Sequence, residues 1–134
     1  MKRIFSLAIV VCMSIFCLAS CASMENFKKN LEKDYDIIET ADYADIDDLA
    51  DEMYLEDIDD YDVKKVMFAT HEDNGRMIYI IECGSNAKAD KLLKDMDDAI
   101  EEIDNYYSFK VDAVVKGSFV LAGAKSAIED ALGE

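Results

Sequence analysis

Apolar residues recur at helical spacing in four segments of the chain. The longest segment, residues 86–104, places its apolar residues three or four positions apart, which puts them on one side of a helix. These residues are Ala89, Leu92, Leu93, Met96, Ile100 and Ile103. Residues 25–33, residues 44–54 and the C-terminal stretch around Ala127 and Ile128 repeat the pattern over shorter lengths. The spacing therefore predicts four helices.

Stretches that favour β-structure lie between these helices. They cover residues 35–39, 64–70, 76–83, 107–115 and 119–121. The pair Asn74-Gly75 predicts a tight hairpin turn between the second and third stretches, because such turns require a positive φ. The element order is α-β-α-β-β-α-β-β-α. This order predicts an α+β fold with a mainly antiparallel sheet of about five short strands and helices on one face.

Gly84 and Gly123 stand at the two corners where a strand leads into a helix. Each follows a strand–strand pair and precedes a helix, so the two strand–strand–helix units resemble an internal repeat. Neither glycine belongs to a glycine-rich loop. We therefore interpret both as packing positions and not as phosphate-binding positions.

The first twenty residues follow a different pattern. Lys2 and Arg3 precede an uncharged apolar run from Ile4 to Ser20. This is the plan of an export signal, and the run is marginal in length for a permanent membrane span. Of the three cysteines near this segment, only Cys21 follows two small residues.

The stretch Leu18-Ala19-Ser20-Cys21 resembles the lipobox of bacterial lipoproteins, with Ser in place of the usual Gly or Ala before the cysteine. The resemblance implies cleavage between Ser20 and Cys21. It also implies a diacylglycerol thioether on Cys21, with acyl chains such as palmitate. Two acyl chains anchor a protein stably on a membrane. The expected location is therefore the cell membrane, lipid-anchored and outside the cytoplasm; the alternative is a plain secretory signal.

On this interpretation residues 1–20 are a removed signal peptide, residues 21–24 a lipidated tether and residues 25–134 a single acidic domain. The chain has 14 Lys and Arg against 30 Asp and Glu, and two of its basic residues lie in the leader. The mature chain thus carries 12 positive and 30 negative charges, a formal charge of −18. Such a charge excludes nucleic acid as a partner, because binding it requires a basic surface.

Acidic residues concentrate in residues 45–62, where ten of eighteen positions are Asp or Glu. Clustered carboxylates are the ligands that calcium prefers. An EF-hand loop is excluded, because a loop begun at Asp45 places Ala50 where glycine is required and one begun at Asp57 ends at Phe68. The candidate cation ligands are those that a loop could wrap around an ion: Asp57, Asp59, Asp60 and Asp62. The alternative is a solvated acidic surface that attracts calcium weakly and diffusely.

No set of residues predicts catalysis. His71 is the single histidine and lies beside the predicted hairpin turn, with no nucleophile in a recognisable motif. Cys83 shares strand parity with Tyr79 and Ile81, which favours a packing role over an intermolecular disulfide. We therefore expect no enzymatic activity and no cofactor beyond the covalent lipid.

The stretches NLEKDYDII, RMIYIIECGSNAKADKLL and GSFVLAGAKSAIEDAL resemble small exported bacterial domains of unknown function. This resemblance implies a fold and assigns no site residue. The sequence thus predicts a membrane-anchored interaction domain that meets an unidentified protein or ligand outside the cytoplasm. The alternative is a divalent-cation-binding or cation-sensing lipoprotein that uses residues 57–62.

Overall fold

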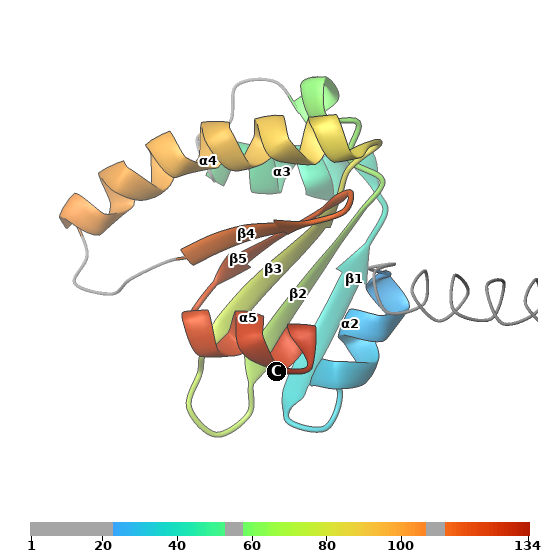
Figure 1. The fold of residues 1–134 in the computed structure, drawn as a ribbon, viewed down its shortest axis with the longest axis vertical. Helices are drawn as coiled ribbons and strands as arrows, with labels where there is room; N and C mark the ends of the chain where they lie inside the picture. Colours follow the sequence, from blue (N-terminus) through green and yellow to red (C-terminus); the bar gives the residue numbers. More distant parts are fainter. Residues whose placement is uncertain (1–22, 53–57, 107–111) are drawn as a thin grey trace, which may run out of the picture.

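The computed structural model describes residues 23–52, 58–106 and 112–134. The helices in this part of the chain are α2 (Met24–Leu31), α3 (Tyr43–Glu52), α4 (Asn86–Tyr106) and α5 (Lys125–Leu132), with a short 3₁₀ turn, η1 (Ile58–Tyr61). The strands are β1 (Tyr35–Thr40), β2 (Lys65–His71), β3 (Met77–Glu82), β4 (Asp112–Lys116) and β5 (Phe119–Gly123). The α+β class and the element order predicted from the sequence are confirmed (Figure 1).

The five strands form one antiparallel sheet in the order β1-β2-β3-β5-β4. Strands β2 and β3 are joined by the predicted hairpin, and Gly75 adopts the expected positive φ of 73°. Strands β1 and β4 stand at the two edges. The predicted fourth strand began at residue 107; β4 begins at Asp112, and residues 107–111 lie outside the described part of the chain.

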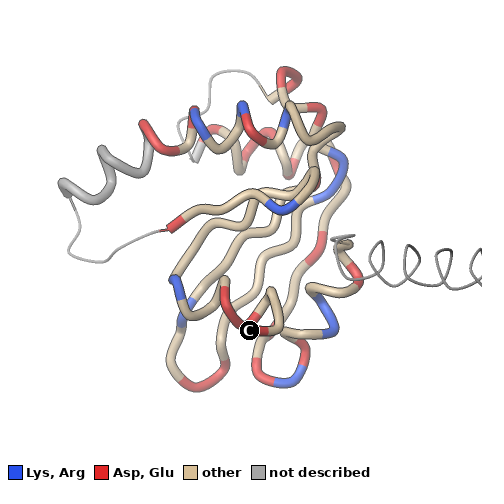
Figure 2. Tube along the Cα trace, viewed as in Figure 1, with Lys and Arg blue, Asp and Glu red and all other residues tan. Residues whose placement is uncertain are grey.

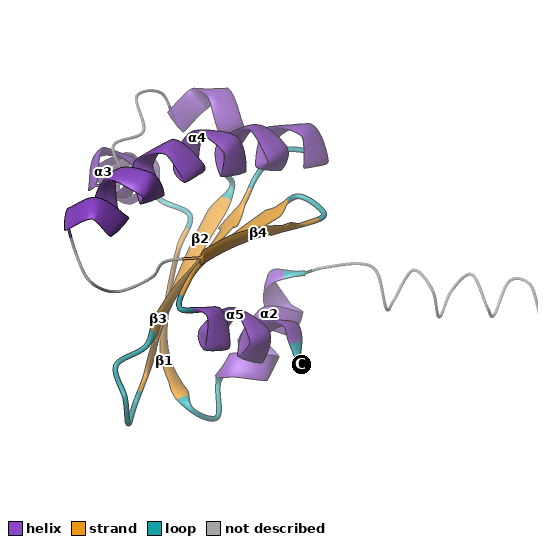
Figure 3. Ribbon diagram, turned by 60° about the vertical axis from the view of Figure 1, so that its left-hand side comes forward, coloured by secondary structure: helices purple, strands orange, loops and turns teal. Residues whose placement is uncertain are grey.

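Helices cover both faces of the sheet, which corrects the expectation of helices on one face. Helices α2 and α5 lie on one side, and α3 and α4 lie on the other (Figure 3). The first core, under α2 and α5, contains Leu31, Ile78, Ile80 and Leu121. The second core, under α3 and α4, contains alternate residues of the same strands together with Ala89 and Leu92. Each face carries its own apolar set, because successive strand residues point to opposite sides.

The two glycine corners serve packing, as expected. A Cβ at Gly84 would collide with the side chain of Asp62. Gly123 has a φ of 157°, and a Cβ there would collide with the carbonyl oxygen of Met77. The helices that follow these glycines, α4 and α5, lie on opposite faces of the sheet, so the two strand–strand–helix units do not occupy equivalent positions.

Candidate functional site

The acidic segment around η1, residues 58–62, is held in place by two buried residues. Ile58 and Tyr61, at the two ends of η1, are buried in the second core, whereas Asp59, Asp60 and Asp62 are exposed. The segment therefore presents carboxylates to solvent because its apolar residues anchor it from below. Asp57, the first of the four candidate cation ligands, lies outside the described residues.

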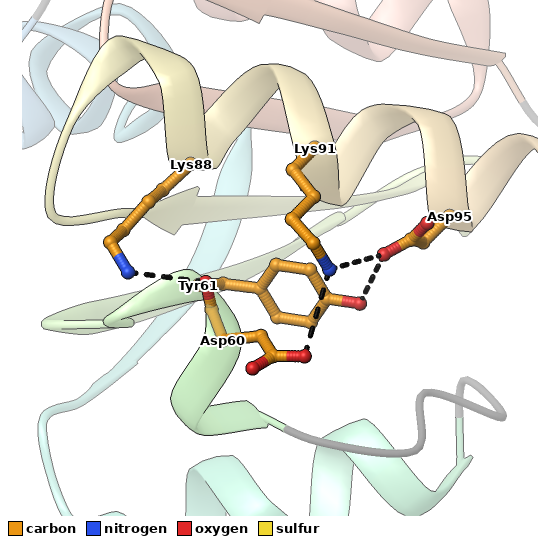
Figure 4. Close-up of polar contacts among 5 residues, drawn as sticks. All are labelled: Asp60, Tyr61, Lys88, Lys91 and Asp95. Atoms are coloured by element: carbon orange, nitrogen blue, oxygen red, sulfur yellow. Dashed lines mark hydrogen bonds and ion pairs between the residues drawn. The ribbon is translucent and has the colours of Figure 1, made fainter.

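Lysines of α4 reach this segment (Figure 4). The hydroxyl of Tyr61 donates a hydrogen bond of 2.7 Å to Asp95, and the ammonium of Lys91 lies 3.2 Å from the same carboxylate oxygen. Lys91 also lies 3.6 Å from the carboxylate of Asp60 and 4.9 Å from the centre of the Tyr61 ring. Lys88 donates to the backbone carbonyl of Asp60 at 3.3 Å. These contacts join η1 to α4.

The contacts set the charge states of the two α4 residues. The hydrogen bond from Tyr61, followed by the contacts with Lys91, lowers the pKa of Asp95. The hydrogen bond to Asp95, together with the neighbouring Asp60, raises the pKa of Lys91. Both groups are therefore charged at neutral pH, and the protein supplies a cation of its own to Asp60.

The other candidate carboxylates have separate surroundings. Asp59 accepts a hydrogen bond of 3.3 Å from the hydroxyl of Tyr43, and Asp62 packs against Gly84. Among the described residues, no group of three or more His, Cys, Asp or Glu side chains could hold a metal ion. The cation-binding role of Asp59, Asp60 and Asp62 thus stays a hypothesis, and the ion pair from Lys91 to Asp60 disfavours it.

His71 and Cys83 have structural surroundings. The Nδ1 atom of His71 accepts a hydrogen bond of 3.2 Å from the backbone N–H of Asp73, and its ring lies edge-on to Tyr35 with centroids 5.0 Å apart. Cys83 is buried in the second core, where burial and the nearby Asp62 raise the pKa of its thiol to about 11. The thiol is therefore protonated and unreactive at neutral pH.

A small pocket opens between α3, η1 and the sheet. It is lined by apolar side chains, including Ile46, Leu49, Ile58 and Val63, and has a volume of about 20 Å³. Pockets that bind organic ligands usually measure about 300–1,000 Å³, and a single water needs ~10–15 Å³. This pocket therefore has room for about one water and none for a metabolite.

A further surface feature is an apolar strip on the sheet face that α3 and α4 partly cover. We define the apolar strip as Ile38, Phe68 and Tyr79, which are cross-strand neighbours on β1, β2 and β3, together with Met77. Ile38 is 67% exposed and Met77 49% exposed. Helices α3 and α4 lie toward one end of this face and leave the end near the β2–β3 hairpin uncovered by them (Figure 3). The other two members, Phe68 and Tyr79, are half-buried. Contiguous exposed apolar patches, more than single exposed side chains, are typical of binding surfaces.

The sequence did not single out this strip. Ile38 is part of a short strand with an ordinary apolar pattern; β1 is an edge strand, so a side chain there has a neighbouring strand on one side only. A partial signal was present, because Asp36 and Ile38 share strand parity and a carboxylate beside an isoleucine on one face indicates solvent contact. Tyr43, at the start of α3, is also 61% exposed.

The residues that carry the lipoprotein resemblance, Leu18, Ala19, Ser20 and Cys21, lie outside the described part of the chain. In the part that is described, no helix is both long enough and apolar enough to span a bilayer. Comparison of the chain with models of protein families, with curated proteins and with solved structures finds no match.

Proposed function

We propose that this chain is a membrane-anchored lipoprotein whose acidic domain binds a protein partner outside the cytoplasm and performs no catalysis. The anchor is a diacylglycerol thioether on Cys21, supported by the export-type leader and by the lipobox-like Leu18-Ala19-Ser20 before the cysteine. The domain itself provides the binding surface.

The single observation that carries the binding role is the exposure of Ile38 within a regular strand. An isoleucine that is 67% exposed contributes little to folding. Full burial of such a side chain is worth about 1.5–3 kcal/mol, so about two thirds of that free energy is available to a partner that covers it. Phe68, Tyr79 and Met77 extend the same surface across three strands.

The geometry of the acidic segment supports this choice over cation sensing. Asp60 is paired with Lys91, and the hydroxyl of Tyr43 donates to Asp59. An ion that bound both carboxylates would have to displace these contacts. Its binding free energy would be lowered by the free energy of the contacts that are lost.

The lipid anchor is tested by mass spectrometry of protein recovered from its native membrane. The N-terminal peptide is expected to begin at Cys21 and to carry diacylglycerol, and Cys21→Ala is expected to leave an unprocessed leader. An unmodified Cys21 in the membrane fraction would contradict the anchor while leaving the binding role open.

The binding role is tested by site-specific photocrosslinking of the full chain in its native membrane. A benzophenone amino acid replaces Ile38 in one variant and Glu129, an exposed residue of α5, in the control. We expect a defined adduct from position 38 that is absent from position 129 and is suppressed by excess unlabelled domain. Equal adducts from both positions, or none from position 38, would refute a binding role for this surface.

A further inference from the structure

We propose that the free edge of β1 accepts an extended, basic segment of the partner protein as a sixth strand of the sheet. This inference rests on the proposed function and names the binding mode and the chemistry of the partner. The open edge of β1, the charges beside Ile38 and the contrast with the opposite edge of the sheet support it.

Strand β1 pairs with β2 and, among the described residues, with no other strand. Its outward edge is therefore able to form main-chain hydrogen bonds with an added strand, which is a common mode of peptide recognition. A strand added there would place alternate side chains on the same face as Ile38, next to the apolar strip.

The charges along β1 differ between its two faces. On the face of the apolar strip, Asp36 is exposed two residues before Ile38, and the hydroxyl of Thr40, two residues after it, donates a 2.8 Å hydrogen bond to Asp45. On the opposite face, Glu39 already lies 3.4 Å from Lys28 and 3.3 Å from Lys65. Among the described residues, neither Asp36 nor Asp45 forms an ion pair, and acidic positions occur along β1 (Figure 2).

This arrangement specifies a complementary segment. On one face it would carry a basic, an apolar and a second basic residue at alternate positions: the basic residues approach Asp36 and Asp45, and the apolar residue covers Ile38. A second copy of this chain fits poorly, because the chain carries a formal charge of −16 and like charges oppose association.

The other edge strand, β4, lacks these features. Its apolar residues are half-buried: Val114 packs on the first core, and Ala113 and Val115 pack on the second. Its ends carry one acidic and one basic residue, Asp112 and Lys116. The exposed apolar side chain and the acidic groups that a basic strand would contact are therefore found at β1 and not at β4.

The test uses the full lipidated chain in nanodiscs of zwitterionic lipid and a synthetic peptide with a Lys-Thr-Ile-Thr-Lys centre. Fluorescence anisotropy measures the affinity, and hydrogen–deuterium exchange locates the contact. Binding is expected with added protection confined to residues 35–40. Ile38→Thr is expected to weaken binding by about fivefold, and Asp36→Asn to weaken it by about threefold and to reduce its salt dependence. Glu129→Gln, a charge change of the same kind on α5, is the matched control and is expected to have no effect.

A peptide N-methylated at alternate amides separates strand addition from simple charge attraction. Because methylation removes main-chain donors, it is expected to abolish binding while keeping the charges. Unchanged binding after methylation, protection at β4 instead of β1, or no binding of the unmodified peptide would each overturn the proposal. If the peptide fails while the crosslinker at position 38 still gives its adduct, strand addition is wrong and the broader binding role stands.

Discussion

Ile38 and Ile80 form a matched pair for testing whether the exposed isoleucine is dispensable for folding. Both occupy strands of the same sheet, but Ile38 is 67% exposed and Ile80 is fully buried in the first core. We consider Ile→Thr at each position, because threonine keeps the β-branch and the strand propensity is little altered. The difference between the two variants then reports burial.

The burial of each side chain sets the expected loss of unfolding free energy in the two variants. At Ile38 about one third of a side-chain burial worth about 1.5–3 kcal/mol is at stake, and threonine retains part of it, so the loss in unfolding free energy is below about 1 kcal/mol. At Ile80 the loss of apolar contact costs about 1 kcal/mol, and the hydroxyl buried without a partner adds about 1–3 kcal/mol. We expect a total of about 2–4 kcal/mol at Ile80.

Urea unfolding monitored by far-ultraviolet circular dichroism measures both values, and equal m-values for the two variants establish that the comparison is valid. Ile80→Thr is expected to lower the midpoint clearly, and Ile38→Thr to leave it near that of the wild type. A cost at Ile38 equal to that at Ile80 would mean that the side chain is covered within the isolated protein. A partner would then gain no apolar contact by covering Ile38.

Three further predictions concern stability. Burial raises the pKa of the Cys83 thiol to about 11, so the thiol ionises in the unfolded state first and the wild type loses about 2–3 kcal/mol of unfolding free energy between pH 9 and 11. Cys83→Ala should remove this part of the alkaline destabilisation, which urea midpoints at several pH values measure. Tyr61→Phe should cost about 1 kcal/mol at neutral pH, with a difference from wild type that shrinks as pH falls through the lowered pKa of Asp95, whereas a constant difference would exclude a role for the carboxylate charge. Gly123→Ala should cost about 3 kcal/mol or more by thermal unfolding, because the added Cβ collides with the backbone of β3. The cost should be well above that of Gly117→Ala, where φ is also positive but a Cβ would meet only Asn86 Oδ1, at 4.0 Å; equal costs would contradict the close approach to β3.

Melting temperatures with and without calcium test whether the acidic segment binds a cation. At about 1 mM, calcium is expected to raise the melting temperature no more than sodium chloride of equal ionic strength, because a ligand stabilises only in proportion to its specific occupancy. A saturable rise with calcium that is lost in Asp59→Asn and Asp60→Asn would contradict this expectation. It would establish the acidic segment as a cation site despite the contact between Asp60 and Lys91.

The element order could be predicted from the sequence because it depends on local periodicity. The stripe that begins at Ala89 and the Asn74-Gly75 turn both act within a few residues, and both are found in the structure. A local signal also bears on the expectation that helices cover one face of the sheet, which was wrong. In β3, Ile78 and Ile80 point to one core and Ile81 to the other, so the run is apolar at both parities, which is typical of a strand covered on both sides.

The candidate surface could not be predicted in the same way. The exposure of Ile38 follows from the order of strands in the sheet, which depends on contacts distant in sequence. The contact between Tyr61 and Asp95 joins residues 34 positions apart, and nothing in either local pattern specifies the pair. Composition identified the acidic segment but not the lysines of α4 that reach it.

The proposed anchor and the proposed binding edge constrain each other. Cys21 precedes Met24, the first residue of α2, by three positions, and three residues of chain reach at most about 11 Å. This is close to the screening length of about 8 Å at physiological ionic strength, so a domain of formal charge −18 (12 basic against 30 acidic residues after the leader) would be repelled by anionic headgroups. Lys28 of α2 contacts Glu39 of β1, so the proposed binding edge lies beside the helix that follows the proposed anchor. A basic segment added at β1 would therefore reduce the repulsion between the domain and the headgroups while it covers Ile38. A partner that is itself held at the membrane surface fits both the short tether and the acidic edge of β1.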